Sequence, residues 1–192
     1  MMLRTFRIPC KAIALACALG WLAPAVAAGP ARPAAINPCA LLTTDEVSAV
    51  MGQTVEPGRF ADNGLTKEGA YSTTCLWAVA LPQGVAPDPS KSLGGRSFAI
   101  LHVMNWPGGP NDARKFLDDF RSAFESQAIS SKPVAVEVGA DEALWWGDGV
   151  AARKDGVSFG MSVATAGDRA ARRPKAESLA RLVVQRLART QG

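Results

Sequence analysis

The nine residues SFAILHVMN, at positions 97–105, predict a strand in the middle of a sheet. Successive side chains of a strand point to opposite faces. Both faces of this strand are apolar: Phe98, Ile100, His102 and Met104 share one, and Ala99, Leu101 and Val103 share the other. A strand that is apolar on both sides is typical of a central position. We therefore expect this strand inside a sheet that is covered on both faces.

Period-two alternation predicts further strands at about residues 70–81, 134–138, 143–146, 150–153 and 157–164. Asp155-Gly156 is a strong hairpin signal ahead of the last of them. One face of that last strand carries only small residues, so a helix is expected to approach the sheet most closely there: Ser158, Gly160, Ser162 and Ala164. The polar span 58–68 and the span 82–95, which is rich in proline and glycine, are predicted to be loops.

Three helices are predicted around these strands. A capping box of Thr43 and Glu46 opens a short helix, and Gly52 ends it. Asn111 is expected to cap a second helix, whose apolar residues follow the i, i+3, i+4 spacing as far as Phe124. A third helix with a leucine- and valine-rich stripe lies near the end of the chain. Runs of strands between helices predict an α+β fold, with an antiparallel sheet and helices packed on it.

Residues 1–28 have the three parts of a secretory signal peptide: a basic start, an apolar run and small residues that suit cleavage near Ala27 and Ala28. The apolar run is AIALACALGWLAPAV. A spanning helix needs about 20 such residues, so no transmembrane segment is expected in the mature chain. A lipoprotein signal at Cys17 is the less favoured alternative, because its Leu stands one place off the usual position. Residues 29–36 are predicted to be a flexible lead-in, and residues 37–190 a single domain.

Composition and charge narrow the classes of function. With 48% apolar and 20% charged residues, the chain is neither a disordered tail nor collagen-like. The net charge is +4, but cleavage of the leader would remove three of the 21 basic residues and leave 18 against 17 acidic ones. A nearly neutral domain has no basic footprint for nucleic acid, so nucleic-acid binding is not expected.

The same cleavage would leave two of the four cysteines, Cys39 and Cys75. Export places a chain where disulfides persist, so we expect a disulfide between them. A reactive thiol or a metal-binding pair is the alternative. Because there is no CxxC motif and the single histidine, His102, is remote in sequence, no metal or other cofactor is expected.

Two apparent catalytic motifs lack the context that their chemistry needs. Residues 156–160 match the GxSxG pattern of serine hydrolases, but Ser158 lies within a predicted strand and no histidine follows it. Residues 147–152 match a dinucleotide fingerprint, but the turn at Asp155-Gly156 leaves no room for the helix that would hold the pyrophosphate. We interpret both segments as parts of strands and hairpins.

For the other candidate residues, the sequence favours structural roles. His102 is interpreted as a buried histidine with a hydrogen-bond acceptor nearby, and a ligand or proton-transfer role is the alternative. The acidic pairs Asp118-Asp119 and Asp141-Glu142 are interpreted as solvated structural residues.

Aromatic and basic residues supply the best binding candidates. Trp145 and Trp146 are adjacent, so they face opposite sides of a strand. If one of them is exposed near the Trp106 loop, its indole is a candidate binding surface for a sugar, a lipid or a protein partner. A basic segment before the last helix is a candidate polyanion contact, with a solvated helix start as the alternative: Arg169, Arg172, Arg173 and Lys175.

The chain resembles bacterial exported and lipoprotein-like domains of unknown function that open with Asn-Pro-Cys and a capped helix. The resemblance spans about residues 37–188 and rests on short motifs: Asn37-Pro38-Cys39, Leu41-Leu42-Thr43, Glu46, Cys75 near an aromatic residue, and VGADEA at 138–143. It implies a disulfide-tied, PsbP-like α+β sandwich and no catalytic residues. Many of these relatives are lipidated, whereas the residues around Ala27 here suit ordinary cleavage.

Together these observations predict an exported domain, periplasmic or secreted. We expect it to be non-enzymatic and to bind an unidentified protein or envelope component. The alternatives are an enzyme of unknown class that uses His102 with an unidentified acid, and a structural protein associated with the envelope.

Overall fold

The computed structural model describes residues 33–165 and 169–190. The predicted signal peptide, residues 1–28, lies outside this range, as do the first four residues of the predicted lead-in. Within the described part, Ala34 and Ile36 contact the sheet: their carbonyl oxygens accept hydrogen bonds from Asn105 Nδ2, at 2.9 Å, and from Thr73 Oγ1, at 2.6 Å.

Strand β3 (Phe98–Asn105) lies inside a seven-stranded sheet whose neighbours are all antiparallel. The spatial order is β1-β2-β3-β7-β6-β5-β4. The other strands are β1 (Arg59–Leu65), β2 (Tyr71–Ala78), β4 (Val134–Ala135), β5 (Glu142–Trp145), β6 (Gly149–Lys154) and β7 (Val157–Ala164). Four α-helices and a short 3-10 helix accompany them: α1 (Pro38–Leu41), α2 (Thr44–Met51), η1 (Ser92–Gly95), α3 (Pro110–Glu125) and α4 (Arg172–Thr190). The predicted α+β fold with an antiparallel sheet is confirmed.

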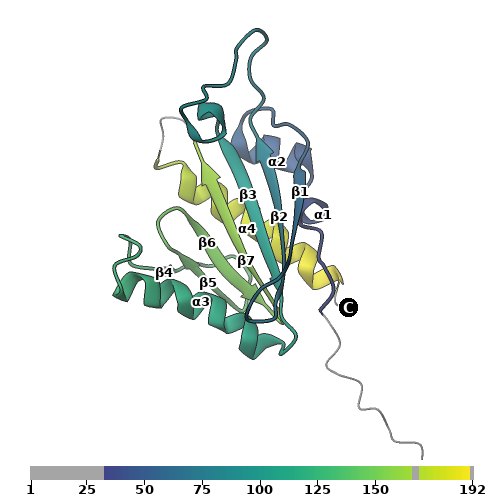
Figure 1. Ribbon diagram of the computed structural model, residues 1–192, viewed down its shortest axis with the longest axis vertical. Coiled ribbons are helices and arrows are strands. Elements are labelled where there is room, and N and C mark those ends of the chain that lie inside the picture. The colour runs from purple at the N-terminus through teal and green to yellow at the C-terminus, as the bar shows by residue number, and fades with distance from the viewer. Residues whose placement is uncertain (1–32, 166–168, 191–192) are drawn as a thin grey trace, which may run out of the picture.

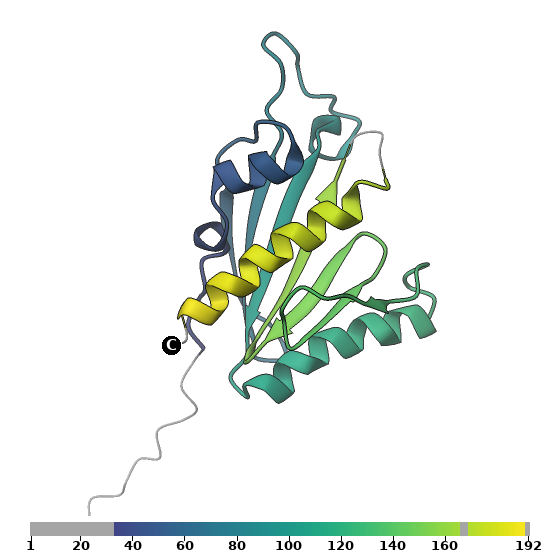
Figure 2. The same cartoon turned by 180° about the vertical axis from the view of Figure 1, so that it is seen from behind.

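The main core lies on one face of the sheet, beneath α4. Leu101 and Phe159 point from the sheet into this core, and Leu179 and Val183 meet them from α4. Figure 2 shows α4 running diagonally across this face, with α2 beside it. All four side chains are fully buried, so the apolar stripe predicted for the last helix is what holds α4 on the sheet.

Helix α3 packs on the opposite face, where the ring of Phe116 lies over Gly160. A Cβ atom added at Gly160 would lie 3.7 Å from Phe116 Cζ, which is ordinary contact distance. The expected close approach of a helix to the small-residue face of β7 is therefore found. Figure 1 shows α3 crossing only part of this face, so the middle of β2, β3 and β7 has no helix in front of it.

The predicted loop at 58–68 is wrong, because β1 occupies most of it. Residues 59–65 read RFADNGL and are mostly exposed, so no apolar alternation marks them as a strand. They pair with the exposed edge of β2, and a bulge at Asn63 interrupts the register. An edge strand needs only backbone pairing on one side, which explains why its side chains carry no strand signal.

Smaller differences concern where elements begin and end. Helix α3 starts at Pro110 after Gly109 and has no side-chain cap, so the predicted cap at Asn111 is wrong. Proline suits the first turn because its missing N–H would have had no partner there. Of the strand predicted at 134–138, only Val134–Ala135 pairs with β5. The capping box of Thr43 and Glu46 is confirmed, and α2 ends at Gly52 in the left-handed conformation.

The predicted disulfide is present and ties α1 to β2. Cys39 and Cys75 are 36 positions apart in sequence, and their Cα atoms are 5.3 Å apart. Cys75 is fully buried in the main core. Gly58 passes so close that a Cβ atom there would lie 2.7 Å from Cys75 Sγ and 2.6 Å from Trp77 Nε1. The bridge therefore sits in a part of the core with no spare volume.

Candidate functional site

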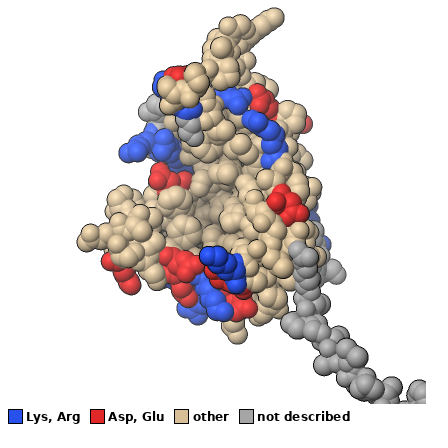
Figure 3. Space-filling model, viewed as in Figure 1, with Lys and Arg blue, Asp and Glu red and all other residues tan. Residues whose placement is uncertain are grey.

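The part of the sheet that α3 leaves open forms a largely uncharged hollow. Figure 3 shows this hollow in the middle of the face, with acidic and basic side chains around its rim. The side chains on this face of the central strands are small or apolar and half-buried, and include Leu76, Phe98, Ile100, Ser162 and Ala164. The opposite face of the same strands is covered by the main core. The strand at 97–105 is therefore fully covered on one face only, and the expected cover on its second face is incomplete.

At one end of the hollow lies an apolar cavity of about 280 Å³. Phe98 of β3, Ala164 of β7 and Trp146, just after β5, are among the residues that line it. The Trp146 ring packs against Phe120 of α3, with 5.4 Å between ring centroids. Trp146 thus packs against α3 and also forms an aromatic wall of the cavity.

A polar cavity of about 140 Å³ adjoins the apolar one, and both are lined by Asp148 and Arg172. Ser130, Ser131 and Arg169 complete its polar lining. We call the two cavities together the Trp146 cleft. It has an apolar end with one indole wall and a polar end with two guanidinium groups and one carboxylate, which is the arrangement typical of a small-ligand site.

Arg172 is the residue between the two ends. Its Nη1 atom lies 3.5 Å from Asp148 Oδ1, so the ion pair is long. Its Nε atom is buried, yet has no hydrogen-bond partner among the described residues. A buried donor without a partner costs about 1–3 kcal/mol. Because Nε is enclosed by protein, only the exposed part of the Arg172 side chain, 21% of its surface, can meet a ligand.

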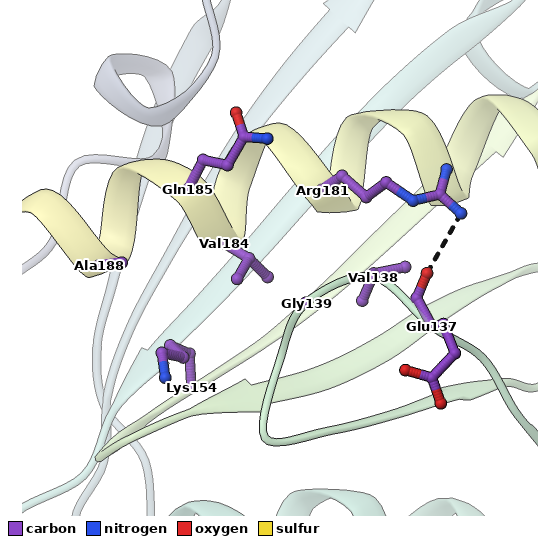
Figure 4. Close-up of a pocket in the computed structure, with 8 residues that line it drawn as sticks. All are labelled: Glu137, Val138, Gly139, Lys154, Arg181, Val184, Gln185 and Ala188. Carbon is purple, nitrogen blue, oxygen red and sulfur yellow. Dashed lines mark hydrogen bonds between the residues drawn. The ribbon is translucent and has the colours of Figure 1, made fainter.

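A larger cavity, of about 520 Å³, lies beside α4 (Figure 4). Val138 and Val184 are among its lining residues, with Arg181 and Lys154 at its edges. Arg181 Nη2 donates to the Glu137 carbonyl oxygen at 3.1 Å, as Figure 4 shows. Lys154 Nζ donates to an Asp141 carboxylate oxygen at 3.0 Å. Both cations thus have protein partners, and no aromatic side chain lines this cavity.

His102 lies on the open face of the sheet but outside all three cavities. Its Nε2 atom is 2.7 Å from Ser72 Oγ, and Ser72 is buried and also accepts a hydrogen bond from Asn63 Nδ2 at 3.2 Å. Burial lowers the pKa of His102 below its ordinary value. No carboxylate hydrogen-bonds to this histidine among the described side chains, so the unidentified acid of the enzyme hypothesis has no counterpart there.

The structure does not gather the three candidate tryptophans on one surface. Trp106 is 7% exposed, and its indole N–H donates to Ser158 Oγ at 2.7 Å in a small second core under α3. Trp145 faces the main core, where the Arg173 guanidinium lies 5.9 Å from its ring centroid. Only Trp146 lines a cavity on the open face.

The basic segment before α4 also divides between different roles. Lys175 Nζ donates to the Met51 carbonyl oxygen at the end of α2. Arg173 pairs with Glu177, with 2.8 Å between Nε and Oε1. Arg169 and Arg172 line the Trp146 cleft. Of the four predicted polyanion contacts, Lys175 and Arg173 therefore bond to protein groups, and Arg169 and Arg172 meet at the cleft.

Asp141 and Glu142 take part in an ion-pair network that ties the β5–β6 hairpin to α3. Arg121 bonds Glu142 across from α3, and Arg153 lies 3.5 Å from both carboxylates. Burial acts to raise the pKa of Glu142, but the hydrogen bond from Arg121 and the nearby positive charges hold it below its ordinary value. Carboxylates that stay ionised in such pairs are structural, which agrees with the sequence interpretation.

The two apparent catalytic motifs are strand segments. Ser158 is fully buried inside β7. Residues 147–152 form the β5–β6 turn and the start of β6, and β6 pairs with β5 over residues 150–153. Neither segment has a helix after it that could present a nucleophile or hold a pyrophosphate.

The described residues hold no cluster of three His, Cys, Asp or Glu side chains suited to a metal ion. No helix within residues 33–165 and 169–190 is both long and apolar enough to cross a membrane.

Sequence reasoning missed most of the cleft. Phe98 and Ala164 were assigned to strands, but nothing in their pattern indicates that their shared face stays open. Asp148, Ser130 and Ser131 lie in turns and loops without a motif. The one usable signal is the face of β7 that carries only small residues. Because these side chains fill little space above the sheet, they leave room for a helix or for a ligand.

Comparison with protein families, with curated proteins and with solved structures finds no match to this chain. The chemistry of the cleft must therefore be inferred from its own residues.

Proposed function

We propose that this protein is an exported, non-enzymatic binding domain whose ligand site is the Trp146 cleft. The observation that carries the proposal is an apolar cavity with an aromatic wall, on a sheet face that α3 covers only in part. A concave, mostly apolar site with a few polar groups is how proteins bind small organic ligands. The buried disulfide fits a protein that acts outside the reducing cytosol.

Binding is favoured over catalysis because the one histidine is already engaged. His102 lies 2.7 Å from the buried Ser72 hydroxyl, away from the cleft. A catalytic base needs to reach a substrate proton directly or through one water molecule. The His102 side chain is better explained as part of the polar filling between β1, β2 and β3.

A neutral fluorescent apolar probe, N-phenyl-1-naphthylamine, tests the site. We expect saturable binding to the mature, oxidised protein, and loss of binding in Ala164→Phe, which fills the apolar cavity. The matched control is Ala188→Phe, which puts the same side chain into the cavity beside α4. Loss of binding in the control alone would place the ligand beside α4, and absence of binding to the wild-type protein would refute the proposed function.

Export is tested separately by sequencing the N-terminus of the protein recovered from the periplasm of the expressing cells. We expect a mature start at Ala28 or Gly29. Recovery from the cytoplasm with residues 1–28 intact would refute this part of the proposal.

A further inference from the structure

We propose that the Trp146 cleft selects small amphipathic carboxylates, with the apolar body against Trp146 and the carboxylate at Arg172. This inference rests on the proposed function and adds the chemical class of its ligand. The two ends of the cleft differ in chemistry but share Arg172 and Asp148. A ligand that fills both must therefore carry an apolar part and a polar part next to each other.

The apolar end sets the size and kind of the ligand body. A cavity of about 280 Å³ lies at the lower limit for organic ligands. Its walls are the rings of Phe98 and Trp146, together with the small side chains of Ser162 and Ala164. These surfaces suit a short alkyl chain or a single aromatic ring, because both can lie flat against an indole.

The polar end sets the charge of the head group. Of the described residues that line this end, two are arginines, Arg169 and Arg172, and one is an acid, Asp148, which gives them a net charge of +1. Among the described residues, the ion pair of Arg172 is the long contact to Asp148, whose side chain is 63% exposed, and the Arg172 side chain is itself 21% exposed. A guanidinium presents a planar fork of donors that matches the two oxygens of a carboxylate. A monoanionic head therefore fits this end in both charge and shape.

The wall of the polar end is built closely enough to hold such a head in place. Gly147 has a φ of 110°, and a Cβ atom there would lie 2.6 Å from Ser131 Oγ. Glycine is thus needed for the β5–β6 turn to meet the loop after α3. Ser131 and Gly147 line this end together with Asp148 and Arg172.

Displacement of N-phenyl-1-naphthylamine from the mature, oxidised protein tests the inference. The competitors are octanoate, octanol, octyl phosphate, octyltrimethylammonium and acetate. We expect octanoate to bind about tenfold more tightly than octanol, because a hydrogen bond to a charged group contributes that much. Octyltrimethylammonium is expected to bind more weakly than octanol, and acetate, which has no apolar body, is expected not to displace the probe.

Variants of opposite sign locate the effect. Arg172→Gln is expected to weaken octanoate binding about tenfold relative to octanol binding. Asp148→Asn removes the competing carboxylate and is expected to strengthen octanoate binding several-fold. The control is Arg59→Gln, which removes one positive charge on the exposed edge strand β1, away from the cleft in sequence and in strand order. It is expected to change neither octanoate nor octanol binding. Far-UV circular dichroism and thermal melting establish that each variant is folded, and Arg169→Gln replaces Arg172→Gln if the latter is not.

The outcomes separate the two proposals. Equal binding of octanoate and octanol, with no effect of Arg172→Gln or Arg169→Gln, would overturn the carboxylate assignment and leave the binding function standing. Tighter binding of octyl phosphate than of octanoate would overturn it in favour of a phosphate head. Failure of the neutral probe itself to bind would refute the proposed function instead.

Discussion

Reduction of the Cys39–Cys75 disulfide is expected to lower the free energy of unfolding by about 4 kcal/mol. The bridge closes a loop across 36 positions, and the chain-entropy relation for a loop of this length gives a loss of about 4 kcal/mol at 25 °C. For a domain of this size each kcal/mol corresponds to about 2–4 °C, so the melting temperature should fall by about 8–16 °C. The effect arises in the unfolded chain, which becomes freer when the bridge opens.

Urea unfolding followed by tryptophan fluorescence measures this difference in protein that lacks residues 1–28, with and without reductant. The reduced wild-type protein keeps both sulfur atoms and so reports the loss of the covalent link alone. The double variant Cys39→Ala, Cys75→Ala also removes sulfur from a core in which Cys75 is fully buried. The variant is therefore expected to be less stable than the reduced protein, because deletion of buried atoms leaves a cavity.

A reduced protein within about 1 kcal/mol of the oxidised one would refute this reasoning. It would mean that the unfolded chain already holds the two cysteines close together, so that the link restricts little. Counting free thiols before reduction provides the control, and the mature protein is expected to show none.

Three further predictions concern single residues. Burial lowers the pKa of His102, so the unfolded chain takes up a proton at about pH 6.5, where the folded protein does not. The free energy of unfolding should therefore fall as the pH drops below that value. In His102→Gln, the urea midpoint measured between pH 5 and 7 should depend less on pH. Gly58→Ala would place a Cβ atom 2.6 Å from Trp77 Nε1 and is expected to cost about 1–3 kcal/mol in urea unfolding. Thr43→Ala removes the hydroxyl of the capping box with Glu46 and is expected to cost about 1 kcal/mol in the same measurement.

Each of these has a result that would count against it. An unchanged pH dependence in His102→Gln would mean that other groups cause the loss of stability between pH 5 and 7. A Gly58→Ala variant as stable as the wild-type protein would show that the disulfide region can shift to make room. For the cap, Thr44→Ala is the matched control and should stay within about 0.5 kcal/mol of wild type; equal losses in both variants would contradict a specific role of Thr43.

Elements whose own residues pack into the core were predicted well. The alternation of β2, β3 and β7, the stripe of α4 and the capping box of α2 all follow from side chains that are buried or bonded locally. Strand β1 is not predicted because its exposed sequence, RFADNGL, has no apolar alternation, and it is held by backbone pairing and by polar side-chain bonds to β2. Helix α1, four residues after Asn37, is too short to show a period, although Asn37 caps it and Pro38 starts it.

The candidate site was predictable only in part. Adjacent tryptophans on a strand must face opposite sides, so Trp145 and Trp146 had to have different environments. Which of the two would line a cavity depended on where α3 and α4 dock, and that is a property of the packed sheet. Arg172 was recognised only as a member of a basic segment, because its meeting with Asp148 joins positions that are separated in sequence and brought together by the β5–β6 turn.

By itself the sequence determined the fold class and the central place of residues 97–105, because period and caps are local properties. It determined the disulfide partners because only two cysteines lie within residues 37–190. Only the tertiary structure decided which sheet face stays open, since that depends on how far α3 reaches over β7 and not on any residue of β7 alone. The Trp146 cleft exists because a helix that packs at Gly160 leaves the neighbouring small residues uncovered, and the chain then brings Arg172 to their edge.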